Sequence, residues 1–227
     1  MLWFLILGIT MLLSFGAMAY LKSVYARASQ VPIASGLTGA QTAERILQWA
    51  GISDVEIVPG DSFLGDHYDP LEKRLVLSPE NYSGSSAANV GVAAHECGHA
   101  LQHQQHYMPL HIRMSSVYAT NFASNAVFYV MMAALFFHVI QPYVAIWIIA
   151  LCFGVIMFFN LITLPVEFDA SARAKVVLQK LGIVRAGPEA DAVSATLNAA
   201  GLTYVAAFIG SLLQLLYYVM LLWGNRR

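Results

Sequence analysis

Two histidines and a glutamate within five residues, His95-Glu96-Cys97-Gly98-His99, are the part of this 227-residue chain best suited to chemistry. The surrounding residues 87–103 have the composition of a helix, on which positions four apart lie on one face. Both imidazoles can therefore hold one ion, and two His with a third ligand and a water form a common catalytic Zn²⁺ site. Such an ion makes its water acidic enough to attack a peptide carbonyl, and Glu96 can accept the proton. The HExxH spacing thus predicts a zinc hydrolase with one Zn²⁺ per chain, His95 and His99 as ligands and Glu96 as the base.

The residues around the motif favour a metal site over a helix that merely has a polar face. Small side chains, which a helix packed tightly in a core requires, surround the histidines: Ala93, Ala94, Gly98 and Ala100. Two further histidines, His103 and His106, follow on the same helix. A metzincin-type ligand set would need Gly at position 102 and His at position 105, where this chain has Gln102 and Gln105. We therefore interpret His103 and His106 as solvated polar positions at the end of the helix.

The third zinc ligand is expected from a carboxylate or histidine far along the chain. Between Arg113 and Arg173 the only acidic residues are Glu167 and Asp169, directly after an apolar stretch that could leave the membrane and return. On a regular helix these two lie about 200° apart, so that only one can face the metal. Asp169 can pair with Arg173 at the i, i+4 spacing. We predict Glu167 as the third ligand, with Asp169 as the alternative and His138, at the far end of a span, as a more remote candidate.

The oxyanion of the transition state needs a donor besides the metal. Four residues have suitable chemistry: His67, Tyr68, Tyr82 and Arg173. Each can equally be a turn, packing or surface residue, so the choice among them stays open.

The composition is that of a membrane protein, with 58% hydrophobic and 11% charged residues. Residues 2–21 carry no charge over a length that can cross a bilayer. A signal peptide is the competing interpretation, because Ala17-Met18-Ala19 resembles a cleavage site. No basic residue precedes Lys22, however, and the apolar run is long for a signal peptide. We expect a retained anchor.

Three further apolar stretches predict membrane spans at about 117–139, 143–164 and 203–223, which makes four in all. Most Lys and Arg residues lie in the two polar segments that separate spans one and two and spans three and four. Positive charge concentrates on the cytoplasmic side, so both polar segments should face the cytoplasm and both termini the outside. The C-terminal pair Arg226 and Arg227 argues mildly for the opposite orientation.

The fold class that we expect is a mainly α membrane protein with about four transmembrane helices and a small α+β, zincin-like domain. The predicted segments are an anchor (1–21), the zincin-like domain with the HExxH helix (22–114), a transmembrane hairpin (115–164), a segment with the third ligand and amphipathic helices (165–201) and a C-terminal transmembrane helix (202–224).

Local signals place several elements within the zincin-like domain. Thr38 and Gln41 have the spacing of a capping box before a helix that ends near Gly51, and Ser85 or Ser86 can cap the zinc helix.

Two short runs, 55–58 and 74–77, read as strands of a small β ribbon joined by the turn-rich residues 59–70. An exposed edge of that ribbon could hold a peptide substrate as an added strand, or the strands could merely cover the helix.

The two cysteines argue against a disulfide-stabilised protein, and the net charge argues against a nucleic-acid-binding protein. Cys97 lies in the metal motif and Cys152 in a predicted span, so no disulfide framework is expected, and Cys97 reads as a small buried side chain. A net charge of −1 gives no reason to expect nucleic acid as a partner.

Several segments in order resemble the neutral zinc metallopeptidase family of YugP-type bacterial membrane proteins, which is distantly similar to HtpX-type membrane proteases. The matching segments are 36–40, 66–70, 92–102, 164–171 and 199–207. The resemblance covers nearly the whole chain after the first span. It implies a membrane-anchored zinc endopeptidase, gluzincin-like, in the bacterial inner membrane, with its catalytic domain facing the cytoplasm.

The resemblance also bears on the residues that support the metal. In HtpX-type proteases a ligand Glu is followed four residues later by an Asp that supports a ligand His. Glu167 matches that ligand, whereas position 171 is Ser, which can accept the His N–H only as a weaker partner. By analogy the partners would be peptide or protein substrates, membrane proteins among them, together with the lipid bilayer. The oligomeric state is left open.

Two other functions compete with a protease acting at the membrane surface. One is an intramembrane-cleaving metalloprotease, but burial of the polar residues 102–106 in lipid would be costly. The other is a catalytically silent zinc-binding scaffold, which would have no use for Glu96.

Overall fold

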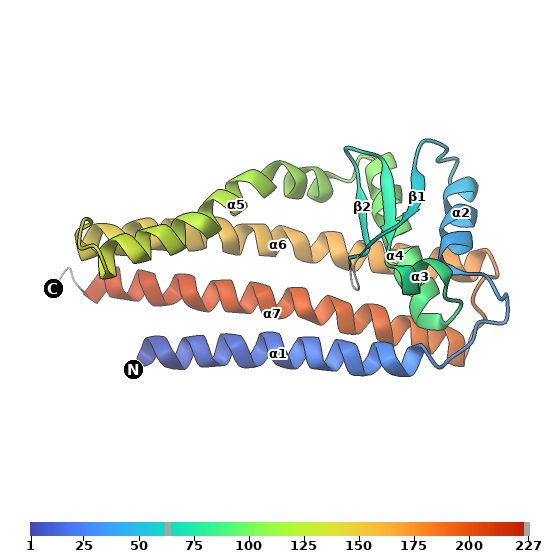
Figure 1. The fold of residues 1–227 in the computed structure, drawn as a ribbon, viewed down its shortest axis with the longest axis horizontal. Coiled ribbons are helices and arrows are strands. Elements are labelled where there is room, and N and C mark those ends of the chain that lie inside the picture. Colours follow the sequence, from blue (N-terminus) through green and yellow to red (C-terminus); the bar gives the residue numbers. More distant parts are fainter. Residues whose placement is uncertain (62–64, 225–227) are drawn as a thin grey trace. The chain divides into compact units, whose positions relative to one another are not determined.

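The computed structural model describes residues 1–61 and 65–224 and is mainly helical (Figure 1). Residues 62–64 of the turn-rich connection and the pair Arg226 and Arg227 lie outside the described residues. The elements, in chain order, are α1 (Leu2–Ala28), α2 (Gly39–Trp49), β1 (Glu56–Pro59), β2 (His67–Asp69), β3 (Arg74–Leu77), α3 (Pro79–Ser83), α4 (Ala87–Gln104), α5 (Met108–Leu135), α6 (Pro142–Lys180) and α7 (Pro188–Gly224).

The chain divides into two compact units, which share the longest helices. An apolar unit comprises Met1–Ala17, His111–Leu164 and Thr203–Arg227, and a mixed unit comprises Met18–Leu110 and Pro165–Leu202. His95, His99, Glu167 and Asp169 belong to the mixed unit, whereas the remote candidate His138 belongs to the apolar unit.

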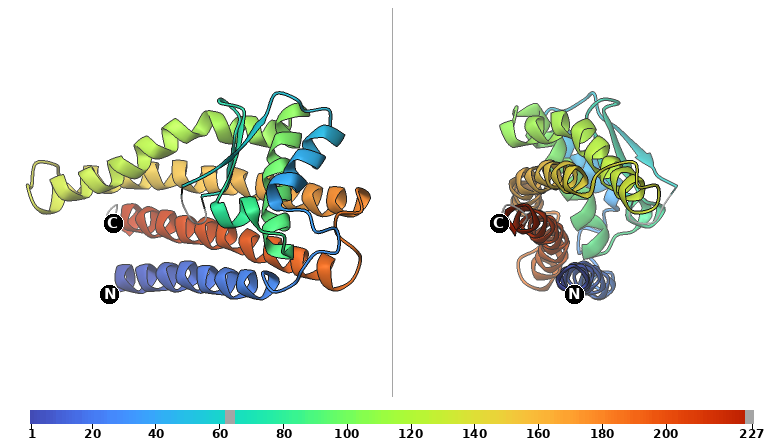
Figure 2. Two further views of the ribbon diagram at one scale, coloured as in Figure 1. Left: turned by 45° about the vertical axis from the view of Figure 1, so that its right-hand side comes forward. Right: turned by 90° about the vertical axis from the view of Figure 1, so that its left-hand side faces the viewer.

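Within the apolar unit, α7 lies between α1 and α6 (Figures 1 and 2). A Cβ added to Gly210 of α7 would lie 2.7 Å from Cγ2 of Thr10 of α1, so these two helices are in close contact. On its other side α7 contacts α6, because the Asn160 side-chain amide donates a hydrogen bond of 3.0 Å to Oγ of Ser211. Small and polar residues at such contacts let helices approach and bond where water is absent.

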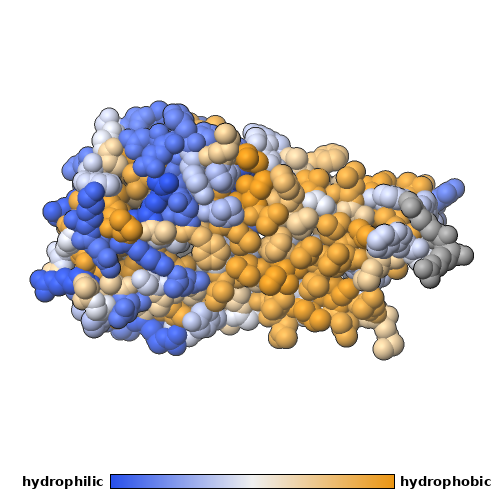
Figure 3. Space-filling model, turned by 180° about the vertical axis from the view of Figure 1, so that it is seen from behind, coloured by the Kyte–Doolittle hydropathy of each residue, from blue (hydrophilic) through white to orange (hydrophobic). Residues whose placement is uncertain are grey.

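Three helices of the described chain are long and apolar enough to cross a membrane: α1, α6 and α7. Apolar side chains cover the apolar unit on the face seen in Figure 3, as lipid contact requires. Helix α5, which contains most of the predicted span 117–139, is not among the three, and it ends at Leu135. Ser, Thr and Asn residues in its first half lower its hydropathy. The fourth span therefore stays a prediction.

The mixed unit contains a three-stranded sheet in the order β1-β3-β2, with β1 parallel and β2 antiparallel to β3. The strands expected at 55–58 and 74–77 are confirmed, within one residue. The simple ribbon between them is wrong, because the two strands run parallel and β2 pairs with the other edge of β3. Strand β2 has only three residues among turn formers, which is too short to show an alternating pattern.

The helices of the mixed unit begin where their capping residues predict. Thr38 and Ser86 are the N-caps of α2 and α4, and each forms a capping box, with Gln41 and Asn89 respectively. Gly51, just after α2, has a φ of +70°, a left-handed conformation that glycine adopts without strain.

Helix α4 is the buried centre of the unit. Apolar side chains of α2, the sheet, α6 and α7 pack around it, including Ile46, Leu75, Leu77, Leu178 and Val193.

Candidate metal centre

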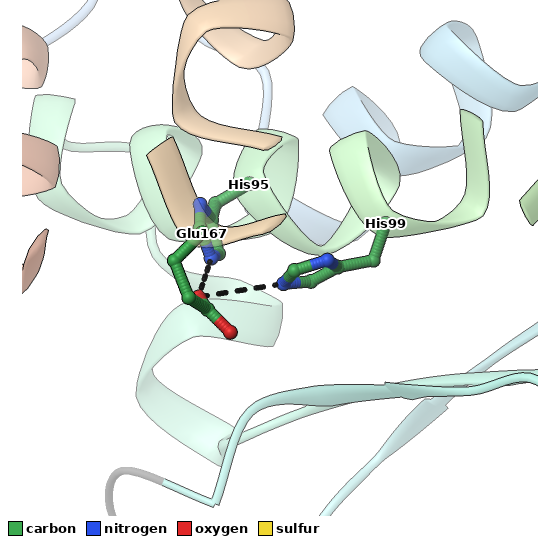
Figure 4. Close-up of side chains that lie close together, drawn as sticks. All are labelled: His95, His99 and Glu167. Atoms are coloured by element: carbon green, nitrogen blue, oxygen red, sulfur yellow. Dashed lines mark hydrogen bonds and ion pairs between the residues drawn. The ribbon is translucent and has the colours of Figure 1, made fainter. Parts of the chain in front are cut away.

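Helix α4 presents two imidazoles to a carboxylate of α6 (Figure 4). Nε2 of His95 lies 3.2 Å from Oε2 of Glu167, and Nε2 of His99 lies 3.6 Å from the same oxygen. Within residues 1–61 and 65–224, these three form the one group of at least three His, Cys, Asp or Glu whose ligand atoms lie within 4.8 Å of one another. The helical spacing of the two histidines aims both rings at one point, and α6 supplies the carboxylate 68 residues after His99.

This donor set fits Zn²⁺. Two imidazole nitrogens and one carboxylate oxygen, with a further position open for water, are the ligands of many catalytic zinc sites. Donors on one tetrahedral Zn²⁺ lie about 3.3 Å apart for bonds of roughly 2.0 Å, close to both distances from Glu167. Glu167 is only 2% exposed, and a carboxylate so deeply buried requires cationic partners or a metal.

The two glutamates of the centre, Glu96 and Glu167, have pKa values shifted in opposite directions. Burial raises the pKa of Glu167, but hydrogen bonds from His95 and His99 outweigh it and hold that pKa far below its usual range. Burial raises the pKa of Glu96, which the two histidines offset only in part. One carboxylate is therefore suited to stay ionised as a ligand, and the other to accept and release a proton.

Each imidazole is held at its second nitrogen by a polar side chain. Nδ1 of His95 lies 3.1 Å from Oγ of Ser171, the position at which the sequence suggested a weak partner. Nδ1 of His99 lies 3.0 Å from Oε1 of Gln102, a residue to which the sequence assigned no role. The available signal was a hydrogen-bonding side chain three positions after His99, on the same helix.

Asp169 is not among the three residues that could hold a metal, and its carboxylate bonds other partners. Its Oδ2 accepts hydrogen bonds from Nε2 of Gln102, at 2.8 Å, and from Nε of Arg173. The predicted i, i+4 pair of Asp169 and Arg173 is therefore confirmed. The assignment of Glu167 as the third ligand stays a prediction, which this arrangement favours.

The candidate oxyanion donors have other hydrogen-bonding partners. The side chain of His67 bonds the carbonyl of Gly65, and the hydroxyl of Tyr68 lies 2.9 Å from Nδ1 of His103. Arg173 bonds Asp169, donates to Oε1 of Gln105 and lies over the ring of Tyr107, 5.7 Å from its centroid.

Four other predictions about single residues can be compared with the structure. His103 is only partly exposed and bonds Tyr68, so its interpretation as a solvated position is wrong. Tyr82 packs against the core of the mixed unit. His138 lies in the apolar unit, three residues after the end of α5. Cys97 is buried as expected, with its thiol 3.7 Å from the carbonyl oxygen of Ala43.

Comparison with known proteins agrees with this chemistry. Residues 3–223 match the family described as "Putative neutral zinc metallopeptidase". Over 214 residues the chain is 41% identical to "Putative membrane protease YugP" of Bacillus subtilis (strain 168), an alignment that covers 94% of this chain and 93% of that protein. No solved structure gave a significant match.

Proposed function

The chain belongs to the neutral zinc metallopeptidase family, and we propose that it is a membrane-anchored zinc endopeptidase. One Zn²⁺ per chain would be held by His95, His99 and Glu167. The observation that carries the proposal is the convergence of both imidazoles on one buried carboxylate, with Glu96 buried on the same helix. A purely structural zinc site has no need of that additional glutamate.

The ion and the side chains around it would have separate roles in hydrolysis. A bound Zn²⁺ would supply polarisation of the scissile carbonyl and a lowered pKa for the attacking water. Glu96 would accept the proton of that water and transfer it to the leaving amine, a role that suits a carboxylate whose pKa is raised by burial. Glu167 stays ionised and holds its position through both histidines.

The polar segments of the sequence support a site at the cytoplasmic surface of the inner membrane. Three helices can anchor the chain, and most basic residues lie in the two segments that form the mixed unit. Peptide segments of other proteins, including membrane proteins, would be the substrates. The short edge strand β2 offers backbone groups to which an extended peptide could bond.

The test combines zinc content with cleavage, using detergent-purified protein and a mixed library of fluorogenic peptides. Wild type should carry about one zinc per chain, and Glu167→Ala should lose it. Glu44→Ala, which removes an exposed carboxylate of α2, serves as the matched control and should keep both zinc and activity. Glu96→Gln should keep the zinc and lose about 10²–10⁴-fold in cleavage rate.

Three outcomes would contradict the proposal. Full zinc content in Glu167→Ala would rule out Glu167 as a ligand. Equal cleavage by wild type and Glu96→Gln would show that Glu96 is not the catalytic base. Stoichiometric zinc in a wild type that cleaves no peptide would favour the scaffold.

A further inference from the structure

Gln102 is a fully buried polar side chain that connects the two helices of the metal centre. It lies on α4, three residues after His99, and has no exposed surface. Its Oε1 lies 3.0 Å from Nδ1 of His99, and its Nε2 donates to the carbonyl oxygen of Val166 and to Oδ2 of Asp169, both at 2.8 Å. Val166 directly precedes Glu167 on α6. One amide therefore contacts a histidine of the centre and the backbone beside its carboxylate.

The partners of the amide nitrogen determine which way this side chain faces. A backbone carbonyl and a carboxylate can only accept hydrogen bonds, so the group between Val166 and Asp169 must be the NH₂ of Gln102. The amide oxygen is then the atom that faces His99. Because this oxygen accepts and never donates, Nδ1 of His99 must carry a proton. Nε2, which lies toward Glu167, is left as the nitrogen that can bind a metal.

The support of His95 lacks this constraint. Its Nδ1 lies 3.1 Å from the hydroxyl of Ser171, which can donate or accept and can rotate. The hydroxyl accommodates either tautomer of His95, whereas the amide of Gln102 accommodates one tautomer of His99.

Asp169 and Arg173 complete the support of the amide. Oδ2 of Asp169 accepts from both Gln102 and Arg173, and Arg173 also donates to Gln105, the C-cap residue of α4. The carboxylate of Asp169 is thus bonded by a residue of α4 and by a residue of α6. The bond from Arg173 to Gln105 is a further connection between α6 and the end of α4. This explains the presence of Asp169 near the centre without making it a ligand.

We propose that Gln102, anchored by Asp169 and the carbonyl of Val166, is the positioning residue that sets the tautomer and ring orientation of His99 for metal binding. The inference rests on the proposed function, because it assigns a role in the same zinc centre. Groups that orient a ligand histidine through its second nitrogen typically contribute 10–100-fold to metal affinity.

The test measures zinc affinity by competition with a chromophoric chelator, in the full-length protein in detergent. Gln102→Met keeps the length of the side chain but removes its hydrogen bonds with His99, Val166 and Asp169. It should weaken zinc binding by about 10–100-fold. Gln104→Met is the matched control, because Gln104 is an exposed residue of the same helix that bonds the carbonyl of Ala50. This control should bind zinc as wild type does. Circular dichroism of each variant checks that the helices are retained.

A second pair of variants separates orientation from mere packing. Gln102→Glu retains an acceptor for His99 but places its other oxygen against Asp169 and the Val166 carbonyl, so zinc binding should weaken. Adding Asp169→Asn supplies an NH₂ group that can donate to the new carboxylate. The double variant should recover at least part of the lost affinity. The visible spectrum of the Co²⁺-substituted protein should shift in Gln102→Met and return toward the wild type in the double variant.

The outcomes distinguish this inference from the proposed function. Wild-type zinc affinity in both Gln102→Met and Gln102→Glu would overturn the role of Gln102 and leave the peptidase standing. No recovery in the double variant would overturn the anchoring role of Asp169. A wild type that binds zinc but cleaves no peptide would overturn the peptidase, while the affinity ratios would still support or refute the role of Gln102.

Discussion

A Cβ added to Gly98 would lie 2.5 Å from the carbonyl oxygen of Ala170. The backbones of α4 and α6 therefore touch at this point, one residue before His99 and three residues after Glu167. No side chain other than hydrogen fits between them. The contact sets the separation of the two helices that carry the three candidate ligands, and makes this glycine a requirement of the centre's geometry.

We predict that Gly98→Ala forces the two helices apart. The expected loss of stability is about 1–3 kcal/mol from overpacking against backbone that cannot move aside. This loss outweighs the gain of roughly 1 kcal/mol in helix propensity that alanine normally brings. Zinc affinity should fall as well, since Glu167 would move away from the histidines. Chemical denaturation and zinc competition measure the two effects.

Gly91→Ala, on the same helix, is the control for this substitution. A Cβ at Gly91 would lie 3.4 Å from Cγ1 and 3.8 Å from Cα of Val193, both ordinary van der Waals distances. This variant should be as stable as wild type or slightly more stable. If Gly98→Ala is no less stable than Gly91→Ala, the close approach to Ala170 does not exist in solution.

Tyr68 should make the stability of the folded protein depend on pH in the alkaline range. Burial, followed by the charges of Asp54 and Asp69, raises the pKa of Tyr68 from 10.0 to about 12. Because the unfolded chain releases this proton first, the tyrosine contributes stability that is fully present below pH 10 and is lost as the pH rises to about 12.

The comparison of wild type with Tyr68→Phe isolates this contribution from the other tyrosines. At pH 8 the variant lacks the hydrogen bond to His103 and should be about 0.5–1.5 kcal/mol less stable. Between pH 10 and 12 the difference should shrink, because only the wild type then loses the contribution of Tyr68. Denaturation at a series of pH values measures it, and a constant difference would refute the raised pKa.

Much of this fold was predictable because the signals are local. The caps at Thr38 and Ser86 act within one helical turn, and α4 accordingly runs from Ala87 to Gln104, close to the expected 87–103. Strand β3 falls where its apolar run predicts. The position of Glu167 near the histidines followed from its isolation in an apolar stretch, without any knowledge of the packing.

What the sequence could not show depends on contacts between distant segments. Strand β2 exists because β3 supplies its partners, and three residues carry too little pattern to reveal it. The role of Gln102 depends on which atoms of α6 face it, and His103 is held by a tyrosine 35 residues earlier. Spacing along one helix predicts neighbours on that helix but not the partner that a side chain meets across the core.

Asn81 should be the most sensitive polar residue of the mixed unit outside the metal centre. Its buried Oδ1 accepts from the hydroxyl of Tyr25, at 2.7 Å, and from Nδ2 of Asn89, at 3.0 Å. Its own Nδ2 donates to Asp66. Asn81→Ala removes an acceptor from the buried Tyr25 and Asn89 and a donor from the half-buried Asp66, and should cost about 2–4 kcal/mol of stability. Ser83→Ala, on the same short helix but exposed, should cost less than about 0.5 kcal/mol. Equal losses of stability in the two variants would show that the hydrogen bonds of Asn81 are not formed.

The orientation of the chain in the membrane, and the fourth span, can be tested together by labelling single cysteines. Glu72 and Gln141 are both exposed and lie on either side of the predicted span 117–139. In a background where Cys97 and Cys152 are replaced by alanine, a membrane-impermeant maleimide should label Gln141→Cys on intact cells. Glu72→Cys should react only after permeabilisation, because basic residues hold its segment in the cytoplasm. The reverse pattern would invert the topology. Labelling of both positions from the same side would mean that the chain does not cross the bilayer between them, so that α5 would lie at its surface and the spans would number three.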